Sequence, residues 1–202
     1  MIVGIGGRKG AGKDVYADRL VSEHGFVKVM MSEAISDATS VIDPLIPARK
    51  HLLTGSVLPV SASRWLTILT HVPYSVYLHT VCGGDYALAK ENVEVRRVLQ
   101  HVGDVCIAVD PLVWVNRAKE AVQSYVDSGI DVVLTGVRFP VEVDIVRHLG
   151  GDAVWVSRPG FDNTSDTHRT ETGVGADSFD VVVMNDGTID DLHRKADARH
   201  AR

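Results

Sequence analysis

A glycine-rich segment near the start of the chain has the residue types and spacing that bind phosphate. The segment Gly7-Arg-Lys-Gly-Ala-Gly-Lys13-Asp14 fits the pattern G-x4-G-K, which is the P-loop pattern. Glycines permit positive φ angles, successive N–H groups form a cradle for anions, and a helix N-terminus adds positive potential. The Lys13 ammonium can reach terminal phosphates, so the segment predicts binding of a nucleoside triphosphate such as ATP. The expected nucleotide contacts are Gly7, Arg8, Lys9, Gly10, Ala11, Gly12, Lys13 and Asp14.

Asp14 stands where a P-loop normally carries Ser or Thr, whose hydroxyl binds Mg²⁺. A carboxylate is a hard oxygen ligand and can hold Mg²⁺ directly or through water. An acid in the first turn of a helix is also favoured by the helix dipole, so a simple capping role is the alternative. We assign Asp14 as the metal ligand. The nine histidines and two cysteines show no zinc-type spacing, so the only metal expected is Mg²⁺ bound with the nucleotide.

The segments around the P-loop alternate between strand and helix patterns. Buried strand patterns occur at 1–6, 26–31, 131–135, 153–157 and 181–184. Helical spacing of apolar residues, with start and stop signals, predicts helices from about 13, over 32–42, from 95 to a terminus at Gly103, over 115–125, over 140–149 and from 188. Alternating strands and helices predict an α/β fold in which a central parallel sheet is covered on both faces, a three-layer αβα arrangement.

Two stretches depart from this alternation. Residues 43–63 are rich in proline, glycine and serine, and Pro73 interrupts any single helix in the apolar stretch that follows. Residues 158–178 are polar and contain three glycines, which suits a lid over a site. At 202 residues, the chain has the length of one domain.

Composition limits the function classes. The formal net charge is −5, so there is no overall positive field to hold a nucleic-acid backbone, and we expect no stable nucleic-acid binding. No stretch has the ~18 uninterrupted apolar residues of a membrane helix, so no membrane association is expected. Two cysteines and the absence of a signal-peptide pattern favour a reducing cytoplasm.

Several further motifs resemble those of the bacteriophage deoxynucleoside monophosphate kinases, a P-loop group whose loop typically reads G-K-D. Their order along the chain is also that of the family. The motifs are Gly12-Lys13-Asp14, Ala17-Asp18, Glu94-Val-Arg-Arg-Val-Leu-Gln100, Asp110-Pro-Leu-Val-Trp114, Val137-Arg-Phe-Pro140, Ser157-Arg-Pro-Gly160, Asp166-Thr-His-Arg169 with Glu171, and Asn185-Asp-Gly-Thr-Ile-Asp-Asp-Leu192.

The resemblance implies a nucleotide-kinase fold and a phosphotransferase activity. The reaction would transfer the γ-phosphate of ATP, with Mg²⁺, to a deoxynucleoside monophosphate (dNMP) in the host cytoplasm. It implies one kinase domain over 1–202, an acceptor-binding insertion at about 43–92, mostly helical, and a lid at about 158–178. The expected partners are small nucleotides, and the expected state is a monomer or a homodimer.

The resemblance also suggests roles for individual residues. Lys13, Arg138, Arg158 and Arg169 would be the catalytic cations, because guanidinium groups match phosphate oxygens bidentately. Asn185 lies where related kinases place the donor adenine. The same residues also fit an ordinary turn before a helix capped by Thr188, and the two interpretations can coexist. The residues assigned to the acceptor are Arg96, Arg97, Gln100 and Trp114.

Two positions depart from the family pattern. Where the family commonly has D-V-R-F-P-N-E, this chain has Gly136 in place of the aspartate, so an expected carboxylate is missing. The arginine that often follows Leu99-Gln100 within a few residues is also missing, since 105–108 are Val-Cys-Ile-Ala. Arg96 or Arg97 could bind the acceptor phosphate instead.

Three alternatives remain open from the sequence. A P-loop kinase for another phosphorylated metabolite, such as phosphomevalonate, also uses a G-K-D loop. A non-catalytic nucleotide-binding module would account for the two departures from the family pattern. An ATP-driven motor fits poorly, because the strand over 131–135 runs into Gly136 rather than into an acidic pair.

Overall fold

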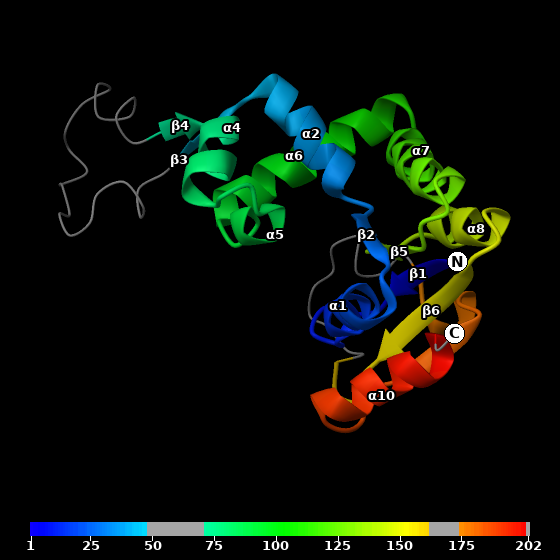
Figure 1. Cartoon of the computed structure of the whole chain (residues 1–202). Helices are drawn as coiled ribbons and strands as arrows, with labels where there is room; N and C mark the ends of the chain where they lie inside the picture. Colours follow the sequence, from blue (N-terminus) through cyan, green and yellow to red (C-terminus); the bar gives the residue numbers. More distant parts are fainter. Residues whose placement is uncertain (48–70, 162–173, 201–202) are drawn as a thin grey trace. The chain divides into compact units, whose positions relative to one another are not determined.

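Residues 1–47, 71–161 and 174–200 are described by a computed structural model (Figure 1). The chain forms two compact units. Unit 1 contains residues 1–32 and 114–202, and unit 2 contains residues 33–113. Unit 2 is therefore inserted into unit 1 along the sequence.

A parallel sheet forms the centre of unit 1. Its strands are β1 (Ile2–Gly6), β2 (Val27–Met30), β5 (Val132–Thr135), β6 (Asp152–Ser157) and β7 (Val181–Met184). Their order across the sheet is β2-β5-β1-β6-β7, and each neighbouring pair is parallel. In this register Ile5 of β1 lies between Thr135 of β5 and Val154 of β6. The carboxyl ends of the strands thus share one edge of the sheet, where open α/β sheets bind ligands.

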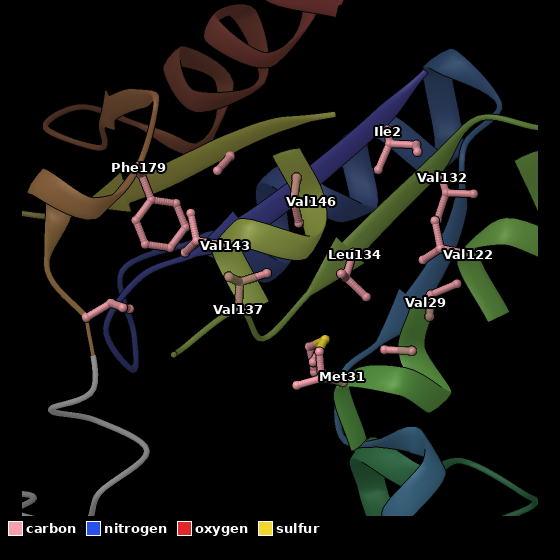
Figure 2. Close-up of a cluster of buried hydrophobic side chains, with 14 of the residues drawn as sticks. Ile2, Val29, Met31, Val122, Val132, Leu134, Val137, Val143, Val146 and Phe179 are labelled. Atoms are coloured by element: carbon pink, nitrogen blue, oxygen red, sulfur yellow. The ribbon is translucent and has the colours of Figure 1, made fainter. Parts of the chain in front are cut away.

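Helices cover both faces of this sheet. On one face α7 (Val113–Asp127) and α8 (Pro140–His148) pack on a cluster that includes Ile2, Val132 and Leu134, shown in Figure 2. On the other face α1 (Lys13–His24) and α10 (Ile189–His200) pack on a cluster that includes Val3, Ile5 and Val133. The alternation of side chains along β1 and β5 supplies both cores. The fold is therefore the expected three-layer αβα arrangement with a central parallel sheet.

Polar contacts also join α1 to α10, which lie side by side in Figure 1. The Arg19 guanidinium donates to both carboxylate oxygens of Asp197, at 2.9 and 2.8 Å, and His24 Nε2 lies 2.9 Å from the same carboxylate. The Tyr16 hydroxyl lies 3.0 Å from His200 Nε2 in a buried contact. Burial raises the pKa of Tyr16 to about 12 and lowers the pKa of His200 to about 4. These contacts fix the helix that follows the P-loop.

Unit 2 is mainly helical. Its elements are α2 (Glu33–Ile42), β3 (Leu45–Pro47), β4 (His71–Pro73), α4 (Tyr74–Val76), a π-helical turn η1 (Tyr77–Val81), α5 (Tyr86–Ala89) and α6 (Val93–Val109). Strands β3 and β4 pair antiparallel. A buried contact of 2.7 Å joins the Ser36 and Tyr74 hydroxyls. Strand β4 ends at Pro73 and α4 begins at Tyr74, so no single helix runs through Pro73, as predicted.

One predicted boundary is wrong. Gly103 does not end the helix that begins near Val95, because α6 continues to Val109. Gly103 is buried inside the helix, and a Cβ built on it would lie 3.3 Å from Ile35 Cδ1 of α2. The glycine therefore lets two helices approach closely, and the helix ends before Pro111, which disfavours helical conformation in the residue before it.

The other predicted strands and helices of unit 1 are present within one or two residues of their expected ends. The proposed lid at 158–178 and the proposed insertion at 43–92 include residues 162–173 and 48–70, which lie outside the described residues. Within the described parts of the chain, no single helix is long and apolar enough to cross a membrane.

Candidate nucleotide-binding site

The P-loop joins the end of β1 to the start of α1, at the carboxyl edge of the sheet of unit 1. Gly10 and Gly12 adopt positive φ angles of 81° and 98°, which L side chains rarely adopt. The Ala11 N–H donates to the Arg8 carbonyl at 3.1 Å, so the loop is internally bonded. The N-terminus of the 12-residue α1 therefore begins directly after a tight glycine turn, as an anion site requires.

Lys13 and Asp14 occupy the first two positions of α1. The Lys13 side chain is only 13% exposed, whereas that of Asp14 is 64% exposed. Lys13 Nζ lies 3.3 Å from Asp14 Oδ2. A cation and a hard oxygen ligand are thus adjacent at the helix N-terminus, an arrangement that fits a triphosphate and the Mg²⁺ that accompanies it.

Arg158 follows β6 and reaches the P-loop. Its guanidinium lies over the Phe161 ring, 4.8 Å from the ring centroid, and its Nη1 lies 3.5 Å from the Gly10 carbonyl oxygen. A Cβ built on Gly10 would lie 2.7 Å from the Phe161 ring, so the ring packs directly on the loop. The structure therefore brings together two of the predicted residues, Gly10 and Arg158, and Phe161 packs against both.

Asn185 follows β7 and also contacts the P-loop. Its side-chain Nδ2 donates to the Ala11 carbonyl at 2.9 Å, and its backbone N–H donates to the Ser157 carbonyl at 2.7 Å. The next residues start α10 with a reciprocal cap, in which Thr188 donates from its backbone and hydroxyl to Asp191 and accepts from the Asp191 N–H. The predicted Thr188 cap is confirmed.

Arg138 lies just beyond the end of β5. The Val137 N–H donates to the Ile5 carbonyl at 3.2 Å, which places the segment beside the end of β1. The buried Glu142 side chain accepts hydrogen bonds from the backbone N–H groups of Arg138, at 2.6 Å, and Phe139, at 3.0 Å. Burial raises the pKa of Glu142 to about 7, although these two bonds and the Arg138 charge oppose the increase.

Gly136, which replaces the expected aspartate, has a φ of 81°. The replacement therefore concerns the backbone as well as the missing carboxylate, because an aspartate at position 136 would have to adopt the left-handed conformation.

The other predicted site residues lie in different parts of the fold. Arg96, Arg97 and Gln100 lie on the exposed surface of α6 in unit 2, where Arg97 pairs with Glu94 at 2.9 Å. Trp114 is buried at the start of α7. In the P-loop, Arg8 lies 5.7 Å from the Trp155 ring centroid and Lys9 is exposed. Arg169 lies outside the described residues.

Sequence reasoning missed two residues that shape this site. Glu142 could have been found, because an acid two residues after Pro140 at a helix start is a capping signal. Phe161 carries no local signal, since its contact with Gly10 depends on the arrangement of β1 and β6.

Comparisons with known proteins agree with the motifs. Residues 77–196 match the model of a family described as deoxynucleotide monophosphate kinase. The deoxynucleotide monophosphate kinase of Escherichia phage RB69 is 33% identical over 104 residues, which are 50% of this chain and 42% of that protein. The enzyme of the same name from Enterobacteria phage T4 is 33% identical over 109 residues, or 52% and 45% of the two chains.

These alignments span less than half of each relative. Among solved structures, a dephospho-CoA kinase from Campylobacter jejuni has a TM-score of 0.43 and 12% identity, covering 98% of this chain and 94% of that one.

The family match covers more than half of the chain and includes β5, β6, β7 and the segment from Arg138 to Glu142. The chain therefore belongs to the deoxynucleotide monophosphate kinase family.

Proposed function

We propose that this protein is a deoxynucleoside monophosphate kinase that transfers the γ-phosphate of ATP to a dNMP, giving a dNDP and ADP. The observation that carries the proposal is the position of Lys13, at the first residue of α1 after a loop that turns at Gly10 and Gly12. The family supports the class of acceptor, because its description and the names of the two phage relatives specify deoxynucleotide monophosphates.

The reaction needs charge and alignment more than covalent chemistry, because the acceptor phosphate is already an anion. Lys13 and the amides of the P-loop would hold the β and γ phosphates of ATP. Asp14 offers an exposed carboxylate to Mg²⁺, which neutralises charge on the triphosphate when bound.

Arg158 and Arg138 would cover the transferring phosphoryl group. Each follows a strand at the carboxyl edge of the sheet, and Arg158 already contacts the P-loop. Arg169 is proposed for the same role from the family motif alone. Arginine suits this task because its planar fork binds two phosphate oxygens at once.

The residues proposed to bind the acceptor are three in unit 2 and Trp114, which follows unit 2 in the sequence. Arg96, Arg97 and Gln100 present side chains on the exposed surface of α6 and could bind the acceptor phosphate, and Trp114 is proposed as the aromatic contact. The proposal includes the acceptor-binding role of residues 43–92, the lid role of residues 158–178, and action on small nucleotides in the host cytoplasm as a monomer or homodimer.

Acceptor-dependent ADP formation tests this proposal. The full chain is incubated with ATP and Mg²⁺, and each of the four dNMPs, the ribonucleotides and phosphomevalonate is supplied singly. Stimulation by one or more dNMPs is the expected result and defines the base preference. Stimulation by phosphomevalonate alone would show that the acceptor is another phosphorylated metabolite and not a dNMP. ATP binding without acceptor-dependent turnover would indicate a nucleotide-binding module.

The variant Lys13→Ala links this activity to the P-loop. We expect loss of transfer with an unchanged melting temperature, because the side chain acts on phosphate. Lys119→Ala, on the exposed surface of α7, is the matched control and should retain full activity. Turnover near the wild-type rate in Lys13→Ala would refute the assignment of the loop.

A further inference from the structure

The contacts of the P-loop point to a role for Asn185 that differs from contact with the donor base. We propose that Asn185 is a positioning residue, which fixes the peptide group between Ala11 and Gly12 so that the Gly12 N–H faces the phosphates. This inference rests on the proposed nucleotide-binding function of the loop and deepens it.

The hydrogen bond from Asn185 determines the direction of that peptide group. The Asn185 Nδ2 donates to the Ala11 carbonyl oxygen at 2.9 Å. In a planar trans peptide the C=O and the following N–H point in opposite directions. Because the Ala11 carbonyl is held toward Asn185, the Gly12 N–H points away from Asn185. A hydrogen bond to a carbonyl on one side thus orients a donor on the other.

The contact is also sterically close. A Cβ built on Gly12 would lie 2.5 Å from Asn185 Nδ2 and 3.1 Å from a methyl group of Leu192. The amide therefore packs directly against the Gly12 Cα. A side chain at residue 12 would displace Asn185 even if it could adopt the φ of 98°.

Asn185 is itself held in place from two directions. Its N–H donates to the Ser157 carbonyl at the end of β6, and α10 begins four residues later with the reciprocal Thr188–Asp191 cap. The neighbouring Arg158 approaches the preceding carbonyl, that of Gly10. Consecutive carbonyls of the P-loop are thus approached by donors from the ends of β6 and β7. This arrangement preorganises the loop for an anion before any nucleotide binds.

The test separates orientation of the loop from recognition of the base. Asn185→Leu keeps a similar volume but removes the donor, and Asn185→Gln keeps an amide donor on a longer side chain. Each full-length variant is titrated with inorganic tripolyphosphate, ATP and GTP by calorimetry. Asn116→Leu, at an exposed position on α7, is the matched control.

If Asn185 orients the loop, Asn185→Leu weakens binding of all three ligands by a similar factor of about tenfold, close to the worth of a hydrogen bond. The ratio of ATP to GTP affinity then stays at its wild-type value, Asn185→Gln recovers part of the loss, and the control binds normally. Weaker ATP binding with unchanged tripolyphosphate binding would overturn the proposal in favour of a base contact. Unchanged binding of all three ligands would also overturn it.

A measurement on the wild-type protein covers the case in which Asn185→Leu does not fold. Addition of tripolyphosphate should shift the Gly12 amide proton downfield in ¹H–¹⁵N NMR spectra, because that N–H would donate to the anion. A Gly12 amide that does not respond while other loop amides do would overturn the proposal. Failure of the kinase proposal gives a different result, namely tripolyphosphate binding without transfer to any acceptor.

Discussion

The buried carboxyl of Glu142 makes the stability of unit 1 depend on pH in a direction that can be predicted. Its side chain is 7% exposed and accepts from two backbone N–H groups at the start of α8. Burial raises its pKa from 4.5 to about 7. The unfolded chain therefore loses this proton at lower pH than the folded chain does. The stability contributed by the neutral form is fully present below pH 4.5 and is lost as the pH rises through about 7.

The magnitude follows from the two pKa values. One pH unit of difference corresponds to about 1.4 kcal/mol, so the interval from 4.5 to about 7 amounts to about 3 kcal/mol. Glu142→Gln keeps an oxygen acceptor and cannot ionise. Relative to wild type, the free energy of unfolding of this variant should therefore increase by about 3 kcal/mol between pH 4 and pH 8.

Urea unfolding followed by circular dichroism at several pH values measures this difference, and other titrating groups cancel between wild type and variant. Glu120→Gln, at an exposed carboxylate of α7, is the control and should show no comparable change. A difference between Glu142→Gln and wild type that is independent of pH would refute the reasoning. A Glu142 titration midpoint near 4.5 in ¹³C NMR spectra would refute it as well.

Three further predictions concern other parts of unit 1. Tyr16→Phe should lower the free energy of unfolding by about 1–3 kcal/mol, because it leaves the buried His200 nitrogen without its partner, whereas Tyr125→Phe at the surface should have little effect in the same urea assay. Gly136→Asp should lower the free energy of unfolding by about 1 kcal/mol, because φ is 81° at this position, and an unchanged melting temperature would contradict this. Asp14→Asn should raise the Mg²⁺ concentration at half-maximal rate by about tenfold, and an unchanged Mg²⁺ titration would leave Asp14 as a helix cap.

The features that sequence could predict are those determined by residues close together in the chain. The P-loop is one, because the turn glycines and Lys13 lie within eight consecutive residues between a strand pattern and a helix pattern. The cap by Thr188 is another, because its partner is three residues away. The alternation of elements also predicts the three layers, since each βα step must bury its helix on the sheet.

The features that sequence could not predict depend on contacts between distant segments. Asn185 and Ala11 are 174 positions apart, so the bond between them follows only from the strand order. Glycine is a common stop signal, so the sequence predicts a helix terminus at Gly103, whereas the structure shows that this small residue serves the close packing of Ile35. The same reason applies to Phe161, whose ring covers a glycine in another segment.

The strand order has a consequence for how the chain folds. Strand β5 lies between β1 and β2, so the first two strands of the chain are not neighbours, and both pair with residues 132–135. During synthesis, more than a hundred residues, including all of unit 2, must therefore follow β2 before β5, the strand that pairs with both β1 and β2, is made. Closing such long loops is entropically costly and slow. The P-loop follows β1 directly, so the strand that positions it has no sheet partner until residues 132–157 have been synthesised.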